Sequence, residues 1–350
     1  MKKSVLIIGI LFLGLLVTGA TSCNIKSKST ASDGGVYQST DFGENWKQII
    51  TIAKAEKEGQ NIGNIDTRFI TFDSANENLM YLNTTGNGIF ASTNKGTTWK
   101  QTSLSTGTYA SLSIDARNNN VIYTTQGSKI LKTVDGMKSW HEIYTETRPG
   151  QKIVSVVVDP FQSNIIYAAT TTSIIKSIDF GNTWKLLGWE KTQIISLHVS
   201  KINNQTLYAR VNGGIYKSTN AAIDWTIVSE GLKEFRGGTS IHWFNFDPNT
   251  EIIFLGTGFG IIKSTDRAQT WVAIPTLFDF RKIPIKTVIY HPENLNKIIF
   301  SVNNVLHKTD DGGKTWKTLK TVRTTRTITY MVTDPSIDDL IFLGTTRPAK

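Results

Sequence analysis

Apolar and polar positions alternate along most of the chain in short segments of strand length. One phrase recurs seven times: an apolar segment, a polar turn, and a second apolar segment that in most copies carries an aromatic residue. The copies read FITFDSANENLMYL, LSIDARNNNVIYTT, VVVDPFQSNIIYAA, LHVSKINNQTLYAR, FNFDPNTEIIFLGT, VIYHPENLNKIIFSV and YMVTDPSIDDLIFLGT. Alternation and β-branched residues on both sides of each turn predict two strands per copy.

A second phrase runs out of step with the first and also occurs seven times. Its pattern is Ser/Thr-x-Asp/Asn-x-small-x-polar-Trp, and we call it the octapeptide turn. The copies are Ser39–Trp46, Ser92–Trp99, Thr133–Trp140, Ser177–Trp184, Ser218–Trp225, Ser264–Trp271 and Thr309–Trp316. Hydroxyl, carboxylate and amide side chains at this spacing accept hydrogen bonds from nearby backbone N–H groups, so the phrase predicts a tight hairpin turn between two strands.

The third and eighth positions of the octapeptide turn are the most informative about its role. The third positions are Asp41, Asn94, Asp135, Asp179, Asn220, Asp266 and Asp311. The eighth positions are Trp46, Trp99, Trp140, Trp184, Trp225, Trp271 and Trp316. We expect the tryptophans to pack between neighbouring repeats. Because Asn replaces Asp twice, and the fifth position varies among Gly, Met and Ala, we expect a structural role and not a catalytic one.

The spacing of the repeats predicts the architecture. Successive turn tryptophans are 53, 41, 44, 41, 46 and 45 residues apart, a period typical of four-stranded propeller blades. The repeats start at GVYQSTDFGENWKQII, half a blade, and finish at TITYMVTDPSIDDLIFLG, the other half. The sequence therefore predicts an all-β fold: a single seven-bladed β-propeller over residues 36–346, closed by pairing the N- and C-terminal strands in one blade. Residues 347–350 are a tail.

The N-terminus has a different composition. Lys2 and Lys3 precede an apolar run from Val5 to Val17, and Ala20-Thr21-Ser22-Cys23 follows. This order predicts a signal peptide over residues 1–22, and the run is short for a membrane span. The segment resembles a bacterial lipobox with Cys23 as its lipidated residue, although Ala20 stands where Leu is usual. Plain secretion with an incidental thiol is the alternative.

Composition and charge limit the kinds of partner that we expect. Residues 23–35 are polar and read as a lipidated Cys and flexible tether. Cys23 is the only cysteine, and the net charge of +10 would fall to +8 with the loss of Lys2 and Lys3. Because lysines flank the octapeptide turns all around the repeat, we interpret them as solvated surface and expect no nucleic-acid partner. The expected location is outside the cytoplasm, on the periplasmic side of a bacterial membrane or at the cell surface.

The octapeptide turns resemble the Asp-box, or BNR, repeat of sialidases, sortilin-type propellers, xyloglucan hydrolases and photosystem II stability/assembly factors. The resemblance covers about Val36 to Gly344. It implies a propeller whose turns lie on the face opposite the one used for catalysis or binding. It also implies that Asp41, Asp179, Asp266 and Asp311 are turn residues.

The chain offers little that predicts an enzyme. The segment Phe280-Arg281-Lys282-Ile283-Pro284 resembles the Arg-Ile-Pro motif of sialidases, but a Lys interrupts it and it lies late in the chain. Glu190, Glu234 and Asp279 are loop carboxylates, and a glycosidase needs two that flank one bond. His198, His242 and His291 show no metal spacing. We therefore expect no catalytic residue, no metal and no cofactor.

The connections on the face away from the octapeptide turns form the candidate binding face. We expect a partly basic, aromatic-containing surface, with Arg210 in the connection between the second and third strands of its blade. The candidates are Trp189, Arg210, Phe235, Arg236, Phe280, Arg281, Arg323 and Arg326. Ordinary polar loop surface is the alternative.

Two functions from different classes remain open. The first is a non-catalytic, lipid-anchored scaffold that binds a protein or polysaccharide ligand, for which an acidic partner would suit the basic surface. In size and single-propeller form it resembles the photosystem assembly factors. The second is a sialidase-like glycoside hydrolase or a carbohydrate-binding protein. Catalytic turnover that depends on Glu190, Glu234 or Asp279 would favour the second.

Overall fold

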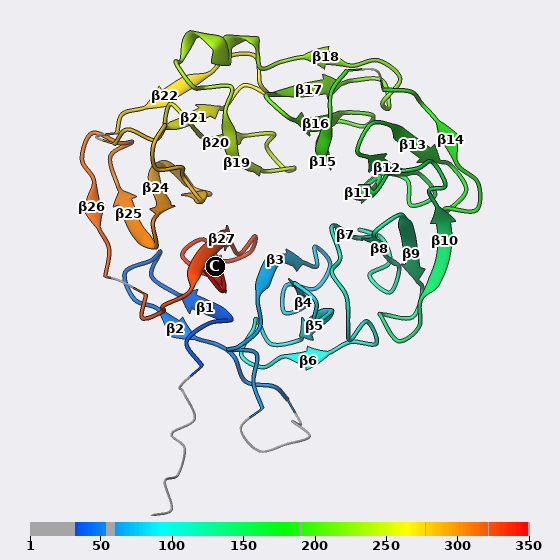
Figure 1. The fold of residues 1–350 in the computed structure, drawn as a ribbon, viewed down its shortest axis with the longest axis horizontal. Helices are drawn as coiled ribbons and strands as arrows, with labels where there is room; N and C mark the ends of the chain where they lie inside the picture. The colour runs from blue at the N-terminus through cyan, green and yellow to red at the C-terminus, as the bar shows by residue number, and fades with distance from the viewer. Residues whose placement is uncertain (1–31, 54–59, 190, 277, 321, 349–350) are drawn as a thin grey trace, which may run out of the picture. The chain divides into compact units, whose positions relative to one another are not determined.

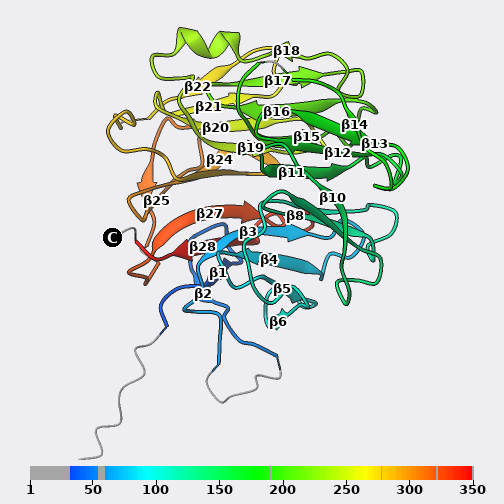
Figure 2. The same ribbon diagram turned by 45° about the vertical axis from the view of Figure 1, so that its right-hand side comes forward.

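A computed structural model describes residues 32–53, 60–189, 191–276, 278–320 and 322–348. Apart from Ser32, these belong to one compact unit, Asp33–Lys350. The predicted signal peptide, Cys23 and most of the predicted tether lie outside the described residues. The described chain forms seven four-stranded antiparallel sheets, arranged as blades around a centre (Figures 1 and 2). The predicted seven-bladed, all-β propeller is confirmed.

Each blade contributes one strand to each of four concentric layers, a to d, from the centre outwards. Strands a are β3 (Thr67–Phe72), β7 (Leu112–Ile114), β11 (Ile153–Val158), β15 (Ile194–Val199), β19 (Ile241–Phe246), β23 (Thr287–His291) and β27 (Thr327–Thr333). Strands b are β4 (Met80–Thr84), β8 (Ile122–Gln126), β12 (Ile166–Thr170), β16 (Leu207–Val211), β20 (Ile253–Thr257), β24 (Asn294–Val302) and β28 (Ile341–Thr346).

The two outer layers are shorter. Strands c are β5 (Ile89–Ser92), β9 (Lys129–Thr133), β13 (Ile174–Ser177), β17 (Gly214–Ser218), β21 (Ile261–Ser264), β25 (Val305–Thr309) and β1 (Val36–Ser39). Strands d are β6 (Lys100–Gln101), β10 (His141–Thr145), β14 (Lys185–Leu186), β18 (Thr226–Ile227), β22 (Val272–Ile274), β26 (Lys317–Thr318) and β2 (Lys47–Gln48). A 3-10 helix, Glu230–Glu234, precedes β19. We number blades 1 to 6 from β3–β6 to β23–β26.

The seventh, closing blade is built from both ends of the chain. Its strand order is β2-β1-β28-β27, and β1 pairs antiparallel with β28 from Val36 opposite Gly344 to Ser39 opposite Ile341. The predicted half-blades at the two ends are therefore confirmed. Pairing them closes the ring and leaves no unpaired edge at the join.

Strands a and b are apolar because both faces of each blade pack against neighbouring blades. All five residues of β12 and of β20 are buried. The core between blades 3 and 4 joins Tyr167 to Leu197 and Leu207. Such two-sided burial explains why these strands read as nearly continuous apolar runs.

Side chains also tie several strands a to the next blade. Ser111 Oγ accepts a hydrogen bond from the Val156 N–H at 3.2 Å, and Thr287 Oγ1 accepts one from the Met331 N–H at 2.9 Å. Ser155 does the same for Leu197 at 3.1 Å. These bonds satisfy backbone N–H groups on the inner edges of blade 3, blade 4 and the closing blade, where strand a has no further strand to pair with.

Candidate functional site

The octapeptide turns are held by their own side chains. Ser39 Oγ accepts the Gly43 N–H at 2.8 Å, and Asp41 Oδ1 accepts the Asn45 N–H at 2.9 Å. In the fourth-blade turn, Asn220 Oδ1 accepts the Asp224 N–H at the same 2.9 Å. An amide oxygen thus does the work of a carboxylate, as expected for a structural turn.

The electrostatics of the turns agree with this role. Hydrogen bonds from Thr183 and Ser177 lower the pKa of Asp179 to about 2. The fifth residue has a positive φ of 89° at Gly43, and still 71° at Met137 and 68° at Ala222. Glycine suits this conformation best, but the side-chain bonds hold the turn without it.

The turn tryptophans pack at the blade interfaces to different depths. Trp99 is fully buried, and its Nε1 donates to the Ile49 carbonyl at 2.9 Å. Trp271 and Trp316 are half-buried and donate across blades to Val228 and Pro275, each at 2.8 Å. These bonds anchor each ring to the outer strand of the preceding blade.

The lysines before the turns are less solvated than the sequence indicated. Lys176 Nζ lies 5.0 Å from the centre of the Tyr167 ring, and Lys217 Nζ lies 5.0 Å from that of Tyr208. Burial lowers the pKa of Lys176. These cations stack on aromatic rings of strand b, so part of the positive charge belongs to the blade packing.

Two aromatic candidates for the binding face are in the core. Trp189 is 8% exposed, donates from Nε1 to the Thr192 carbonyl at 2.6 Å, and meets Trp225 edge-on. Phe280 is 1% exposed and packs on Phe300. The expectation that these rings lie on the surface is wrong, because both fill space between blades.

The carboxylates that would make a glycosidase are not assembled. Asp279 accepts two hydrogen bonds from Arg281, at 2.8 and 2.9 Å, and this lowers the pKa of Asp279 to about 2. Glu234 is exposed at the end of the 3-10 helix, and Glu190 lies outside the described residues. The positive charge of Arg281 is therefore already neutralised by Asp279.

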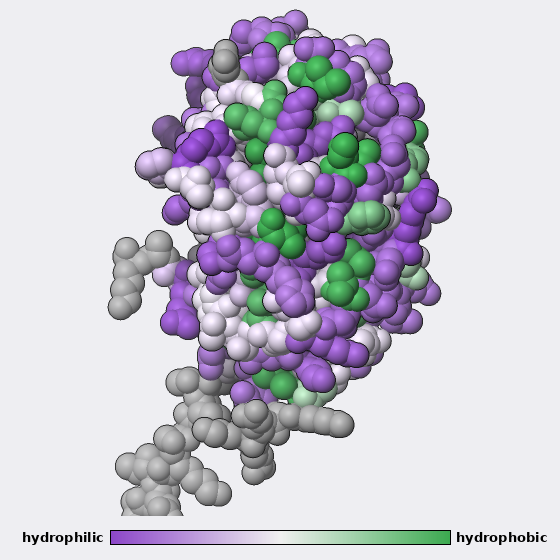
Figure 3. All heavy atoms as spheres, turned by 90° about the vertical axis from the view of Figure 1, so that its right-hand side faces the viewer, coloured by the Kyte–Doolittle hydropathy of each residue, from purple (hydrophilic) through white to green (hydrophobic). Residues whose placement is uncertain are grey.

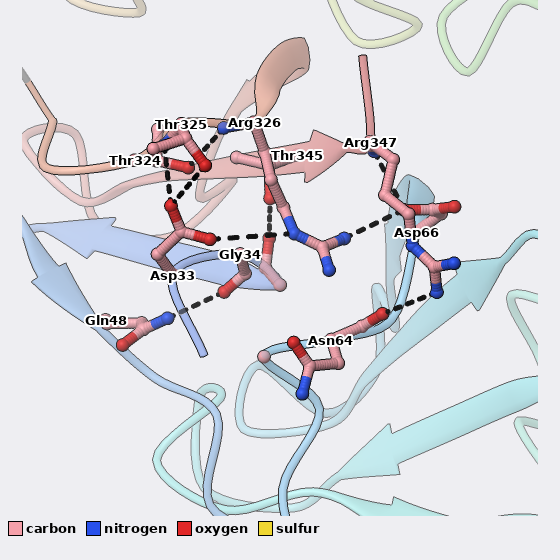
Figure 4. Close-up of polar contacts among 12 residues, drawn as sticks. Asp33, Gly34, Gln48, Asn64, Asp66, Thr324, Thr325, Arg326, Thr345 and Arg347 are labelled. Carbon is pink, nitrogen blue, oxygen red and sulfur yellow. Dashed lines mark hydrogen bonds and ion pairs between the residues drawn. The ribbon is translucent and has the colours of Figure 1, made fainter. Parts of the chain in front are cut away.

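Arg326 closes the ring instead of facing a ligand (Figure 4). It is 7% exposed, and its Nη1 donates to Asp66 Oδ1 at 2.8 Å while its Nε lies 3.9 Å from Asp33 Oδ1. Asp33 in turn accepts hydrogen bonds from Thr325. We call Asp33, Asp66, Thr325 and Arg326 the closure network. It joins the start of the described chain to the C-terminal strands and to blade 1.

The remaining candidates are surface residues. Arg236 and Arg323 are exposed, and Phe235 is half-buried with its ring centre 5.2 Å from that of Phe259. Figure 3 faces the outer strands β10 and β14, where apolar residues form separate patches among polar ones. The outer rim seen there offers no continuous apolar surface.

A ring of side chains at the centre of the binding face was not recognised from the sequence. In five blades strand a bulges near its start, between Thr67 and Phe69 in β3 and between Ile241 and Trp243 in β19, for example. Bulges re-aim side chains and are frequent beside functional sites. The seven strands a can be aligned on the residue that directly follows the bulge. Each blade then contributes one residue at the position of the bulge itself. They are Arg68, Ala110, Val154, Ile195, His242, Lys286 and Thr329, and we call them the mouth ring.

The mouth ring surrounds the end of the central channel. Strands a enter from the d–a connections, which lie on the face opposite the octapeptide turns, and Figure 1 shows these strands innermost. All seven ring residues are exposed or half-buried.

The chemistry of the mouth ring differs between its two sides. Blades 5, 6 and 1 supply His242, Lys286 and Arg68, whereas blades 2 to 4 supply Ala110, Val154 and Ile195. Partial burial and the nearby cations Lys286 and Arg210 lower the pKa of His242. The mouth is therefore cationic on one side and apolar on the other.

Arg210 lies beneath the cationic side. It belongs to β16 and not to a connection between strands b and c, so that prediction is wrong. Its Nη2 donates to the carbonyls of Ile241 at 3.1 Å and His242 at 3.4 Å, while its buried Nε has no hydrogen-bond partner within the described chain. Burial lowers the pKa of Arg210.

These cations lack acidic partners. Among the described residues, no carboxylate oxygen lies within 4.0 Å of the charged nitrogens of Arg68, Arg210 or Lys286. Arg148, Arg281 and Arg326 on the same face all have such a partner. The mouth thus holds positive charge that the described residues do not neutralise.

One aromatic side chain below the mouth ring contacts two sides of the channel. Trp243 packs against the core of blades 5 and 6 and also against that of blade 1 and the closing blade. At the turn end, Lys201 follows β15 and interacts electrostatically with Asp247 and with Asp73 of blade 1, while burial lowers the pKa of Lys201.

The described residues contain no group of three or more His, Cys, Asp or Glu side chains arranged to hold a metal ion. None of their helices has the length and apolar character needed to cross a membrane.

Solved structures of other proteins resemble this chain, whereas no family model and no curated protein matches it. YCF48 from Cyanidioschyzon merolae aligns with a TM-score of 0.61 at 16% identity, over 80% of this chain and 95% of that one. YCF48 bound to D1 peptide gives 0.60 at 15% identity, over 81% and 94%. These likenesses show the fold alone.

A glycoside hydrolase of group GH74 from Niastella koreensis aligns with a TM-score of 0.59 at 17% identity. The alignment covers 88% of this chain but 52% of the enzyme. This chain therefore corresponds to about half of that enzyme.

Proposed function

We propose that the chain is a non-catalytic binding or assembly scaffold whose mouth ring receives an acidic segment of a partner protein. The observation that carries the proposal is the group of cations at the mouth, Arg210, His242 and Lys286, which have no acidic partner among the described residues. Cations without a carboxylate partner attract anions, and they do so more strongly where they are partly buried.

Two further features support a protein partner. The octapeptide turns resemble Asp-box repeats, whose other members include binding propellers as well as enzymes. The solved structure of YCF48 with a D1 peptide concerns a propeller of similar fold that holds a peptide. A fold by itself does not carry function, so the mouth chemistry bears the argument.

The proposal includes a membrane anchor. The N-terminal segment resembles a lipoprotein signal, and lipidation at Cys23 would hold the propeller at the outer side of a bacterial membrane. Detergent phase partitioning of the native chain and of Cys23→Ala tests this. The native chain should enter the detergent phase and the variant the aqueous phase, and equal partitioning would contradict the anchor.

Crosslinking in native membranes tests the partner proposal. We expect Lys286→Glu to reduce capture of the crosslinked partner about tenfold, because it reverses charge at the mouth. Arg236→Glu, an exposed arginine outside the mouth ring, should leave capture unchanged. Equal capture by both variants would refute binding at the mouth.

A carbohydrate ligand is the second candidate. Phe235 is half-buried, and Phe259 and Phe278 are 39% and 38% exposed, so the connections of blade 5 present aromatic faces to solvent. A glycan array and a panel of fluorogenic glycosides test this. Glycan binding that Phe259→Ala abolishes would favour carbohydrate recognition, and turnover that Glu234→Gln or Asp279→Asn abolishes would favour a hydrolase.

A further inference from the structure

We propose that the octapeptide turns of blades 2 to 4 rest on the surface of an anionic phospholipid bilayer. These turns lie on the face opposite the mouth ring, so the inference goes beyond the proposed function and does not depend on it. Three features carry it: exposed apolar side chains, their restriction to three adjacent blades, and the lysines beside them.

Four apolar side chains project from these turns, and we call them the apolar tips. They are Val134, Ile178, Phe180 and Ile223, with exposed fractions of 56%, 64%, 48% and 67%. In blades 1, 5 and 6 and the closing blade, the same positions of the turn carry no exposed apolar side chain. Because apolar surface in water is unfavourable, a group of such side chains on one side of the ring indicates a contact surface.

Other copies of the turn show that its folding does not require the apolar tips. The position of Ile178 is threonine in four copies: Thr40, Thr93, Thr219 and Thr265. The position of Phe180 is glycine in two copies: Gly136 and Gly312. Phe42 shares that position in the closing blade, but its ring is buried and lies 5.1 Å from the His291 ring. Phe180 has the positive φ of 61° that favours glycine, and its ring is nevertheless exposed.

Lysines lie next to the apolar tips. Lys132 Nζ is 5.6 Å from the centre of the Phe180 ring and donates to the Phe180 carbonyl at 2.9 Å. Lys138 and Lys185 are exposed, in the blade 2 turn and directly after the blade 3 turn. Among the described residues, no carboxylate oxygen lies within 4.0 Å of the ammonium groups of these three lysines. Lysines in such positions bind lipid phosphates, while the neighbouring apolar side chains enter the layer below.

The distribution of the apolar tips favours a bilayer over a protein partner. The tips stand on three separate turns, and Figure 3 shows the apolar residues around the outer strands of blades 2 and 3 as separate patches among polar ones. A stable protein interface buries about 800 Å² of closely packed surface on each partner. The interfacial layer of a bilayer, by contrast, accommodates apolar side chains singly. Contact through these turns leaves the mouth ring, on the opposite face, accessible to a partner in solution.

Site-specific fluorescence with the full chain tests the inference. A Cys23→Ala background removes the natural cysteine, and Asn182→Cys in the blade 3 turn then carries the environment-sensitive dye NBD. Gln269→Cys, at the same position of the blade 5 turn, is the matched control. The vesicles contain phosphatidylglycerol and phosphatidylcholine. We expect the emission of the blade 3 label to rise about threefold as it enters the interfacial layer, while the blade 5 label does not change.

Variants assign the response to the apolar tips. Ile178→Thr combined with Phe180→Gly gives the blade 3 turn residues that other copies carry, so the fold is preserved. This pair should raise the lipid concentration at half response at least tenfold, because it removes the two side chains that enter the layer. Ile337→Thr is the control: Ile337 is 43% exposed in the turn between β27 and β28, on the same face but in the closing blade. It should change nothing.

Three outcomes would overturn the inference. The first is an equal response of the two labels, or none from the label in blade 3. The second is a response that grows with protein concentration in the absence of vesicles, which would assign the apolar tips to a second copy of the chain. The third concerns charge: vesicles of phosphatidylcholine alone should require about tenfold more lipid, and an unchanged requirement would show that the surface is not selected for its anions.

Discussion

The closure network and the mouth ring lie on the same face of the propeller and use the same residue types to different ends. In the closure network Arg326 is buried and has Asp66 at 2.8 Å. In the mouth, Arg210 is held only by backbone carbonyls and Lys286 has no carboxylate within 4.0 Å in the described chain. The difference indicates that paired charge here serves the fold, while unpaired charge is available to a ligand.

The largest effect on stability should come from deleting the C-terminal strands that the closure network joins to the start of the described chain. Deleting Thr327–Lys350 removes β27 and β28 and leaves β1 with an unpaired edge. We expect aggregation or loss of cooperative unfolding, measured by light scattering and thermal melts. Deleting only residues 348–350 is the control and should leave a stable monomer. A cooperative monomer after the long deletion would show that closure is dispensable.

Arg326→Met should cost about 3 kcal/mol in the free energy of unfolding. Removing one partner of a buried ion pair leaves the other charge uncompensated, although solvent reaches Asp66 and Asp33 in part. Urea denaturation measures the loss. Arg323→Met alters an exposed residue of the same segment and should change stability by about 0.5 kcal/mol or less. Equal effects would remove the distinction between paired and free arginines.

The closure network should also weaken in acid. Hydrogen bonds from Thr325 lower the pKa of Asp33 from its usual 3.8. A carboxylate with a lowered folded-state pKa contributes stability above its unfolded pKa and loses it as the pH falls through the folded one. The melting temperature should therefore drop below about pH 4, and Asp33→Asn should flatten that drop. A drop of the same size in the variant would assign it to other carboxylates.

The smallest effect on stability should come from the mouth. Lys286→Gln is expected to change the free energy of unfolding by about 0.5 kcal/mol or less, as for other surface substitutions. It should raise the pKa of His242, because a cation that disfavours the imidazolium is gone. NMR titration of the histidine measures the shift. An unchanged His242 titration would mean that the mouth cations do not act together.

Part of the candidate site was open to prediction from the sequence. Arg210 was identified as a candidate although its strand was assigned wrongly, whereas Trp189 and Phe280 are core residues. Exposure of an aromatic ring depends on what the neighbouring blade places over it. Arg68, His242 and Lys286 can be recognised as a group only when the seven strands a are aligned with one another, on the residue that directly follows each of these three.

The sequence by itself determined the number of blades, the closure by both chain ends and the structural role of the octapeptide turns. These depend on short-range causes: strand alternation, and side chains that hydrogen-bond to backbone a few residues away, such as Asp41 to Asn45. Only the tertiary structure decided which charges are neutralised. Arg326 meets Asp66 from 260 residues away, while Arg210 and Lys286 approach His242 from different blades and meet no carboxylate in the part of the chain that the structure describes. Whether a charge is neutralised depends on all of the residues around it in space, and a local sequence pattern does not contain that information.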